Sequence, residues 1–156
     1  MLSTVTDVEA SFYRSINAKD RRQWVARVGK MRVDGSILGS SVGDELPHDL
    51  VTFVVERDLG IVDGFFATVA AGGRFRSMAK KRKRAGKAVI AHNRPGLDRA
   101  ERLVHEHWEA WRQGRPTRCA SSFERTQADW RASAPGSYLT LSWDLVAPRL
   151  TQKRRR

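Results

Sequence analysis

The chain has 156 residues, of which 40% are hydrophobic, and its 29 basic and 17 acidic residues give a net charge of +12. This hydrophobic content excludes wholesale disorder, and a chain of this length buries roughly 70% of its unfolded surface, so we expect one domain. No apolar run reaches the roughly 18 residues of a membrane span, and the first ten residues do not resemble a secretory signal. The single cysteine, Cys119, excludes an internal disulfide. We therefore expect a cytoplasmic protein.

The first third of the chain is expected to form β structure. Residues 8–16 are rich in strand-forming side chains, and residues 23–28 alternate between apolar and polar. The pair Asp34-Gly35 predicts a two-residue hairpin turn that joins a strand over 31–33 to one over 36–38.

The segment over 46–59 is the clearest predicted helix. Asp44 or Glu45 can accept hydrogen bonds from the free N–H groups at its start. Pro47 suits the first turn, and Gly60 suits the position just after the last turn. Apolar side chains cover most of the circumference, so we expect this helix to lie at the centre of the fold.

The later segments complete an α+β pattern. We expect a shorter helix over 63–71, a helical turn over 88–92, helices over 98–113 and 116–134, and a closing strand over 138–143. Strands at both ends with helices between them predict a small N-terminal antiparallel sheet, joined by a C-terminal strand and packed against about four helices. We expect the domain to span 1–148 with a basic loop at 74–94, followed by a disordered basic tail over 149–156.

Two short segments together carry 11 of the 12 net positive charges. Residues 80–87 carry a net charge of +6 and residues 149–156 carry +5, whereas residues 34–63 carry −6. Such basic clusters release counterions from a polyanion, so we predict contact with the backbone of RNA or DNA. An acidic protein partner and a loop with no dedicated partner remain alternatives. The predicted nucleic-acid-binding residues are Arg74, Arg76, Lys80, Lys81, Arg82, Lys83, Arg84, Lys87, Lys153, Arg154, Arg155 and Arg156.

A polar stripe on the predicted 46–59 helix is the main candidate for chemistry. At about 100° per residue, His48, Asp49, Thr52 and Glu56 fall in one arc of the helix. A histidine with two carboxylates suits acid–base catalysis or a hard metal ion, but a metal site needs three or more ligands that converge. We therefore interpret the stripe as the solvated face of a buried helix, with catalysis by His48, Asp49 and Glu56 as the alternative. We predict neither a metal ion nor another cofactor.

The same stretch resembles a known group of proteins. The motif Pro-His-Asp-Leu-x-x-Phe-x-Val-Glu, which ends here at Glu56 and is followed by Leu59-Gly60, is similar to that of small bacterial proteins to which no activity is assigned. In that group a second histidine often stands where this chain has Thr52. The resemblance therefore implies that this chain lacks one half of a histidine pair, which argues further against a metal site.

A second polar face lies on the helix predicted over 98–113. Glu101, His105 and Glu109 recur every four residues with His107 nearby, and stacked Glu and His residues can hold a metal ion inside a helix bundle. Further charged residues share this face, so we interpret it as solvated. No nucleophile elbow or phosphate-binding loop is present in the sequence, so an enzyme is not favoured, and a protein–protein accessory module is a further alternative.

Overall fold

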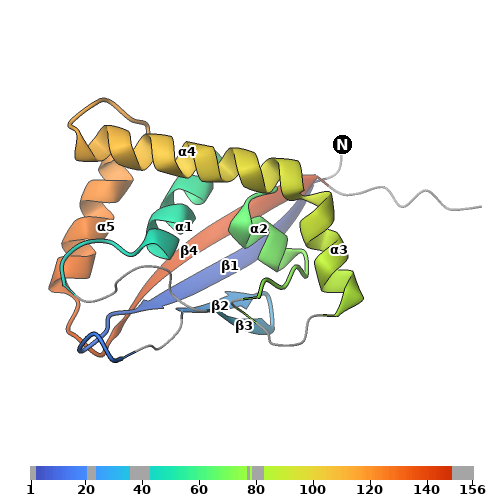
Figure 1. Ribbon diagram of the computed structural model, residues 1–156, viewed down its shortest axis with the longest axis horizontal. Coiled ribbons are helices and arrows are strands. Elements are labelled where there is room, and N and C mark those ends of the chain that lie inside the picture. Colours follow the sequence, from blue (N-terminus) through green and yellow to red (C-terminus); the bar gives the residue numbers. More distant parts are fainter. Residues whose placement is uncertain (1–2, 21–23, 36–42, 77, 79–82, 149–156) are drawn as a thin grey trace, which may run out of the picture.

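One antiparallel sheet organises the chain (Figure 1). The computed structural model describes residues 3–20, 24–35, 43–76, 78 and 83–148, and its strands lie in the order β3-β2-β1-β4. Strand β1 (Ser3–Tyr13) pairs along its whole length with β4 (Tyr138–Pro148). Strand β2 (Trp24–Val28) pairs with the other side of β1, and β3 (Met31–Gly35) forms the far edge. The prediction that a C-terminal strand joins the N-terminal sheet is confirmed.

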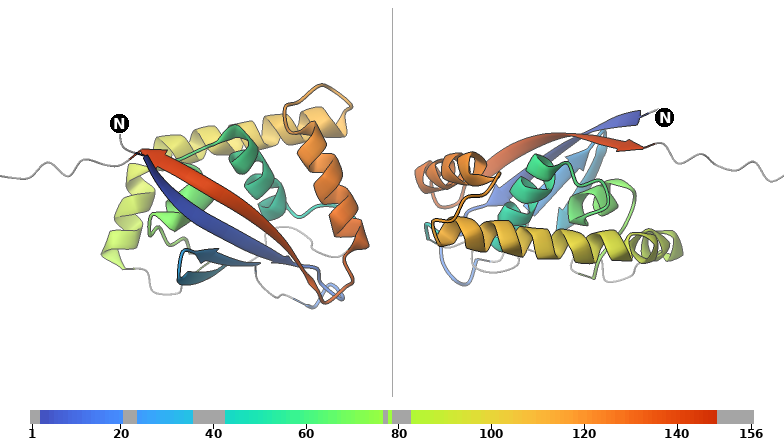
Figure 2. Two further views of the ribbon diagram at one scale, coloured as in Figure 1. Left: turned by 180° about the vertical axis from the view of Figure 1, so that it is seen from behind. Right: turned by 90° about the horizontal axis from the view of Figure 1, so that it is seen from above.

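Helices cover one face of this sheet. Figure 2 shows α1 and α2 between the sheet and α4, while the described helices leave the opposite face open. The α+β class is confirmed, and the described residues form five helices where about four were expected, because residues 84–92 form a full helix and not a single turn. The helices are α1 (His48–Leu59), α2 (Phe65–Ala70), α3 (Arg84–His92), α4 (Arg94–Arg112) and α5 (Ala120–Ala132).

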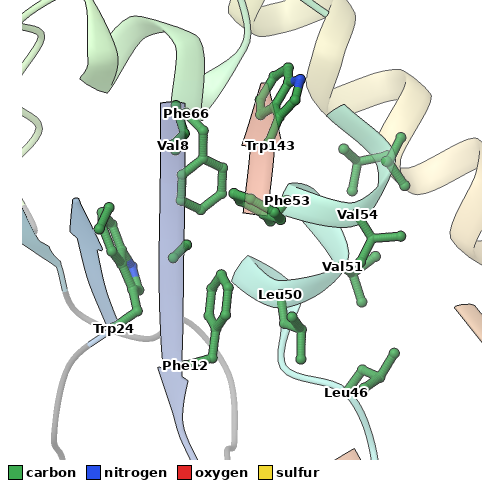
Figure 3. Packing of buried hydrophobic residues seen from close by; sticks show 14 of the residues in the cluster. Val8, Phe12, Trp24, Leu46, Leu50, Val51, Phe53, Val54, Phe66 and Trp143 are labelled. Carbon is green, nitrogen blue, oxygen red and sulfur yellow. The ribbon is translucent and has the colours of Figure 1, made fainter. Parts of the chain in front are cut away.

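The core lies between the sheet and α1 (Figure 3). The Phe53 side chain is fully buried at its centre. Its ring contacts those of Phe66 on α2, Phe12 on β1 and Trp143 on β4 edge to face, at centroid distances of 5.0, 6.0 and 6.0 Å. Edge-to-face packing adds to the hydrophobic gain from burying these rings. The central position predicted for α1 is therefore what the structure shows.

The two ends of α1 are formed differently from each other. Gly60 adopts the left-handed conformation at φ 63°, and the N–H of Ile61 donates to the Glu56 carbonyl at 2.9 Å, as predicted for a glycine-terminated helix. The predicted capping by Asp44 or Glu45 is wrong, because the helix begins one residue after Pro47 and has no side-chain cap. The Asp44 carboxylate instead forms an ion pair with Arg14 at 3.0 Å.

The predicted hairpin turn at Asp34-Gly35 is also wrong. The chain reverses at Gly29, whose φ of 58° a glycine adopts without strain, and Asp34 and Gly35 lie inside β3, opposite Val25 and Trp24. A Cβ atom at Gly35 would overlap the Trp24 ring, so this glycine permits close packing and does not form a turn. The strand expected over 36–38 lies outside the described residues.

A buried arginine attaches α5 to the end of the sheet. The Arg14 guanidinium donates to the carbonyl oxygens of Trp130, Arg131 and Ser133 at 2.6, 3.2 and 2.7 Å, and so binds the backbone where α5 ends. The Trp130 indole N–H in turn donates to the carbonyl of Gly43 at 3.1 Å. These bonds fix the segment that leads into α1 and thereby hold the first turn of that helix in place.

Candidate functional site

Glu56 has a structural role that separates it from the rest of the polar stripe. Its side chain is only 1% exposed, and its carboxylate oxygens accept hydrogen bonds from the backbone N–H groups of Phe65 and Phe66 at 2.7 and 2.9 Å. These donors are free at the start of α2, where the helix dipole also favours negative charge. Burial raises the pKa of Glu56 to about 7, against the opposing effect of the two N–H bonds. The interpretation of this stripe as a solvated face is therefore wrong at Glu56, and also at Asp49 and Thr52, which are buried as well; only His48 is exposed.

The other three residues of the stripe surround the first turn of α1. The Thr52 hydroxyl donates its only hydrogen to the His48 carbonyl oxygen at 3.0 Å. The same oxygen lies 3.4 Å from the Nδ1 atom of His48, so it can only accept a hydrogen bond from that nitrogen. Asp49 is buried, with Oδ1 at 3.8 Å from the same nitrogen. Asp49 raises the pKa of His48 above its ordinary value, against the effect of partial burial, and Glu101 adds to the rise. Both neighbours favour a proton on Nδ1, which leaves the lone pair of the neutral ring on Nε2.

The two polar faces found in the sequence meet in one pocket. His48 on α1 and Glu101 and His105 on α4 line a pocket with a volume of about 880 Å³. The sequence does not predict that these residues share a pocket, because they lie about 50 positions apart and only the packing of α1 on α4 brings them together. The remaining lining residues are Glu45, Leu46, Pro47, Val51, Asp98, Arg102, Val104 and Trp108.

The other residues of the α4 face do not join this pocket. The His107 ring lies 2.6 Å from the Thr117 hydroxyl, and the Glu109 carboxylate lies 3.5 Å from the Arg112 guanidinium. Within the described part of the chain, no group of three or more His, Cys, Asp and Glu side chains is placed to hold a metal ion. Cys119 is fully buried, and burial raises the pKa of its thiol to about 11, so it is not an activated nucleophile.

Part of the basic segment over 74–94 is exposed in the structure. Over the described ranges, five cations of the basic segment are exposed and take part in no ion pair. Arg74 differs, because it is half-buried and donates to backbone carbonyls. Lys80, Lys81, Arg82 and the tail residues Lys153, Arg154, Arg155 and Arg156 lie outside the described residues. The five exposed cations are Arg76, Lys83, Arg84, Lys87 and Arg94.

The basic segment is not a loop throughout. Helix α3 occupies residues 84–92 of the stretch that was expected as a loop over 74–94. Its first turn contains Arg84 and Lys87, directly after Lys83, and has no acidic residue and no side-chain cap. Three cations therefore crowd the end of the helix where the dipole already disfavours positive charge.

Comparison with known proteins gives no family assignment. No protein-family model matches the chain, and neither the curated proteins nor the solved structures contain a match to it. The resemblance to the small bacterial proteins thus stays a prediction, and function is argued from the residues of this chain alone. No described helix has both the length and the apolar character needed to cross a membrane.

Proposed function

We propose that this protein binds the phosphate backbone of nucleic acid through the segment 74–94. The observation that carries the proposal is the set of five exposed cations without an ion pair, in a stretch of chain that contains no acidic residue. Cations that already neutralise a neighbouring carboxylate have less to gain from phosphate, whereas these five are free to exchange water and counterions for it. We also propose a cytosolic setting, because the chain has a single cysteine, and a bacterial origin, from the resemblance of the motif that ends at Glu56.

Two described parts of the basic segment, Arg74 and α3, contact the rest of the fold, which supports binding by a defined surface. The Arg74 guanidinium donates to the carbonyls of Val69 and Gly73 at 3.1 and 2.7 Å and lies 3.4 Å from the Met31 sulfur at the start of β3. A Cβ atom at Gly86 on α3 would lie only 3.2 Å from the Gly72 carbonyl oxygen, so α3 packs closely on this anchor. Arg74 thus joins α3 to the β2–β3 hairpin, whose exposed Lys30 adjoins Met31.

The charge on other surfaces supports the same orientation. Exposed Asp7, Glu9 and Asp144 lie on the open face of the sheet. Within the acidic stretch 34–63, Asp34, Asp44 and Glu45 are exposed, whereas Asp49 and Glu56 are buried. A polyanion is repelled from those regions and attracted to α3. Contacts of this kind go to phosphates and carry no sequence information, so we expect little preference among base sequences.

Charge-neutralising variants test the proposal. We expect Arg84→Gln/Lys87→Gln to bind an oligothymidylate of about 20 nucleotides roughly tenfold more weakly than the wild type in fluorescence anisotropy, because two phosphate contacts are lost. The matched control Arg125→Gln/Arg131→Gln removes two exposed cations from α5 and should leave the affinity nearly unchanged.

Two results would contradict the proposal. An equal loss of affinity in both double variants would mean that only the total charge matters and that α3 is not the binding surface. Competition by poly-glutamate as effective as that by the oligonucleotide would instead indicate an acidic protein partner.

A further inference from the structure

The pocket between α1 and α4 is not explained by nucleic-acid binding. We propose that it binds a small organic ammonium ion with an apolar body, and that His48 and Glu101 receive the ammonium group. This inference is independent of the proposed function, since none of the five exposed cations lines the pocket.

The pocket has the size and the walls of a small-molecule site. Its volume of about 880 Å³ falls within the range of roughly 300–1,000 Å³ that is common for such sites. Leu46 and Val51 from the start of α1 and Val104 from α4 are buried hydrophobic residues at its wall, and the half-buried Trp108 completes an apolar surface. These side chains can bury the hydrocarbon chain or ring of an organic ligand. A small inorganic ion has no such apolar part and would gain nothing from this wall.

The charge of the lining selects a cation. Three carboxylates line the pocket, those of Glu45, Asp98 and Glu101, against the guanidinium of Arg102. Because Glu45 lies 3.9 Å from the Arg112 guanidinium, the excess of negative charge comes from Asp98 and Glu101. A ligand carboxylate or phosphate would face this excess of negative charge, whereas an ammonium group would reduce it. The fixed charges of the lining therefore favour an amine over an acid of the same size.

His48 adds an acceptor that is oriented before the ligand arrives. Thr52 and Asp49 lie on the Nδ1 side of its ring and favour a proton there. Once the pH exceeds the pKa of His48, which Asp49 raises, the neutral ring offers Nε2 as a lone-pair acceptor. Glu101 lines the same pocket as His48, so both acceptors face the space that the ammonium group would occupy. An ammonium group has three donors and no acceptor, which matches these two acceptors.

Ligands of equal size and opposite charge give a direct test. Phenethylamine, phenylacetate and ethylbenzene would be titrated into the ¹⁵N-labelled full chain, and the His48, His105 and Trp108 ring signals followed by NMR. We expect saturable shifts with phenethylamine at an affinity at least about tenfold higher than with phenylacetate, while the signal of the buried Trp130 indole stays in place. Phenylacetate binding as tightly as phenethylamine, or no saturable shift of the pocket signals with the amine, would overturn the proposal.

Variants at exposed positions keep the test separate from folding. Asp98→Asn/Glu101→Gln should weaken phenethylamine binding roughly tenfold, because two of the three carboxylates are neutralised. Glu106→Gln is the matched control, since Glu106 is an exposed carboxylate on the same helix that does not line the pocket. An equal effect of the control, or no effect of the double variant, would refute the assignment of the ammonium site.

Discussion

Replacing the buried Glu56 by Gln is expected to flatten the pH dependence of the free energy of unfolding. The pKa of Glu56 is about 7 in the folded protein against an ordinary 4.5, so between these values the folded state holds a proton that the unfolded state has released. Stability therefore falls as the pH rises through this window. Between about pH 5 and about pH 8 the linkage amounts to about 2–3 kcal/mol in the wild type, and glutamine, which does not titrate, removes it.

Urea unfolding followed by tryptophan fluorescence at the two pH values measures this effect. The decrease in the free energy of unfolding from the lower to the higher pH should be larger by about 2–3 kcal/mol in the wild type than in Glu56→Gln. Glu45→Gln, which neutralises an exposed carboxylate three residues before α1, should behave like the wild type. Parallel pH profiles for the wild type and Glu56→Gln would refute the reasoning about this buried carboxyl group.

Three further predictions concern the buried residues that hold the fold. Arg14→Met should lower the free energy of unfolding by about 3 kcal/mol in urea, because the carbonyls at the end of α5 lose a charged donor; a loss below about 1 kcal/mol would contradict its clamping role. Phe53→Ala should cost about 3–5 kcal/mol by the same assay, and a cost near that of a surface substitution would argue against its central place in the core. Cys119 should react with iodoacetamide, followed by mass spectrometry, far more slowly in the folded protein than in urea, and equal rates would mean that its thiol is not buried.

The parts of the fold that could be predicted from the sequence depend on local physics. The apolar circumference of residues 46–59 and the glycine at position 60 are properties of one segment, and they predicted α1 and its end. The alternation over 138–143 similarly predicted β4, although the strand continues to Pro148 because β1 pairs with it along its whole length.

The errors arose where a distant contact decides between two local possibilities. Asp34-Gly35 and the turn at Gly29 are both plausible hairpin turns, and the choice depends on the Trp24 ring, which packs over Gly35 across the sheet. The capping of α1 failed for a similar reason, because Asp44 is drawn to the buried Arg14. Short-range patterns contain no information on such partners.

The candidate sites show the same division. The basic charge of residues 74–94 could be read from the sequence, but the contact of Arg74 with Met31 that holds this segment beside the hairpin could not. Glu56 was grouped with His48 by helical spacing, whereas its partners are N–H groups of the next helix. Gly64 is a sign in the sequence of this contact between Glu56 and the start of α2, since a Cβ atom at position 64 would overlap the Glu56 carboxylate.

The salt dependence of oligonucleotide binding tests the central claim most directly. The measurement is the association constant of the full chain for single- and double-stranded oligonucleotides between about 50 and about 200 mM salt. If all five exposed cations of the segment contact phosphates, the affinity should fall about 100- to 500-fold over this range. The double variant Arg84→Gln/Lys87→Gln should make the negative slope of log K against log salt shallower by about 2. An affinity that stays constant over this range, or a slope that the double variant leaves unchanged, would contradict nucleic-acid binding through α3 and its preceding segment.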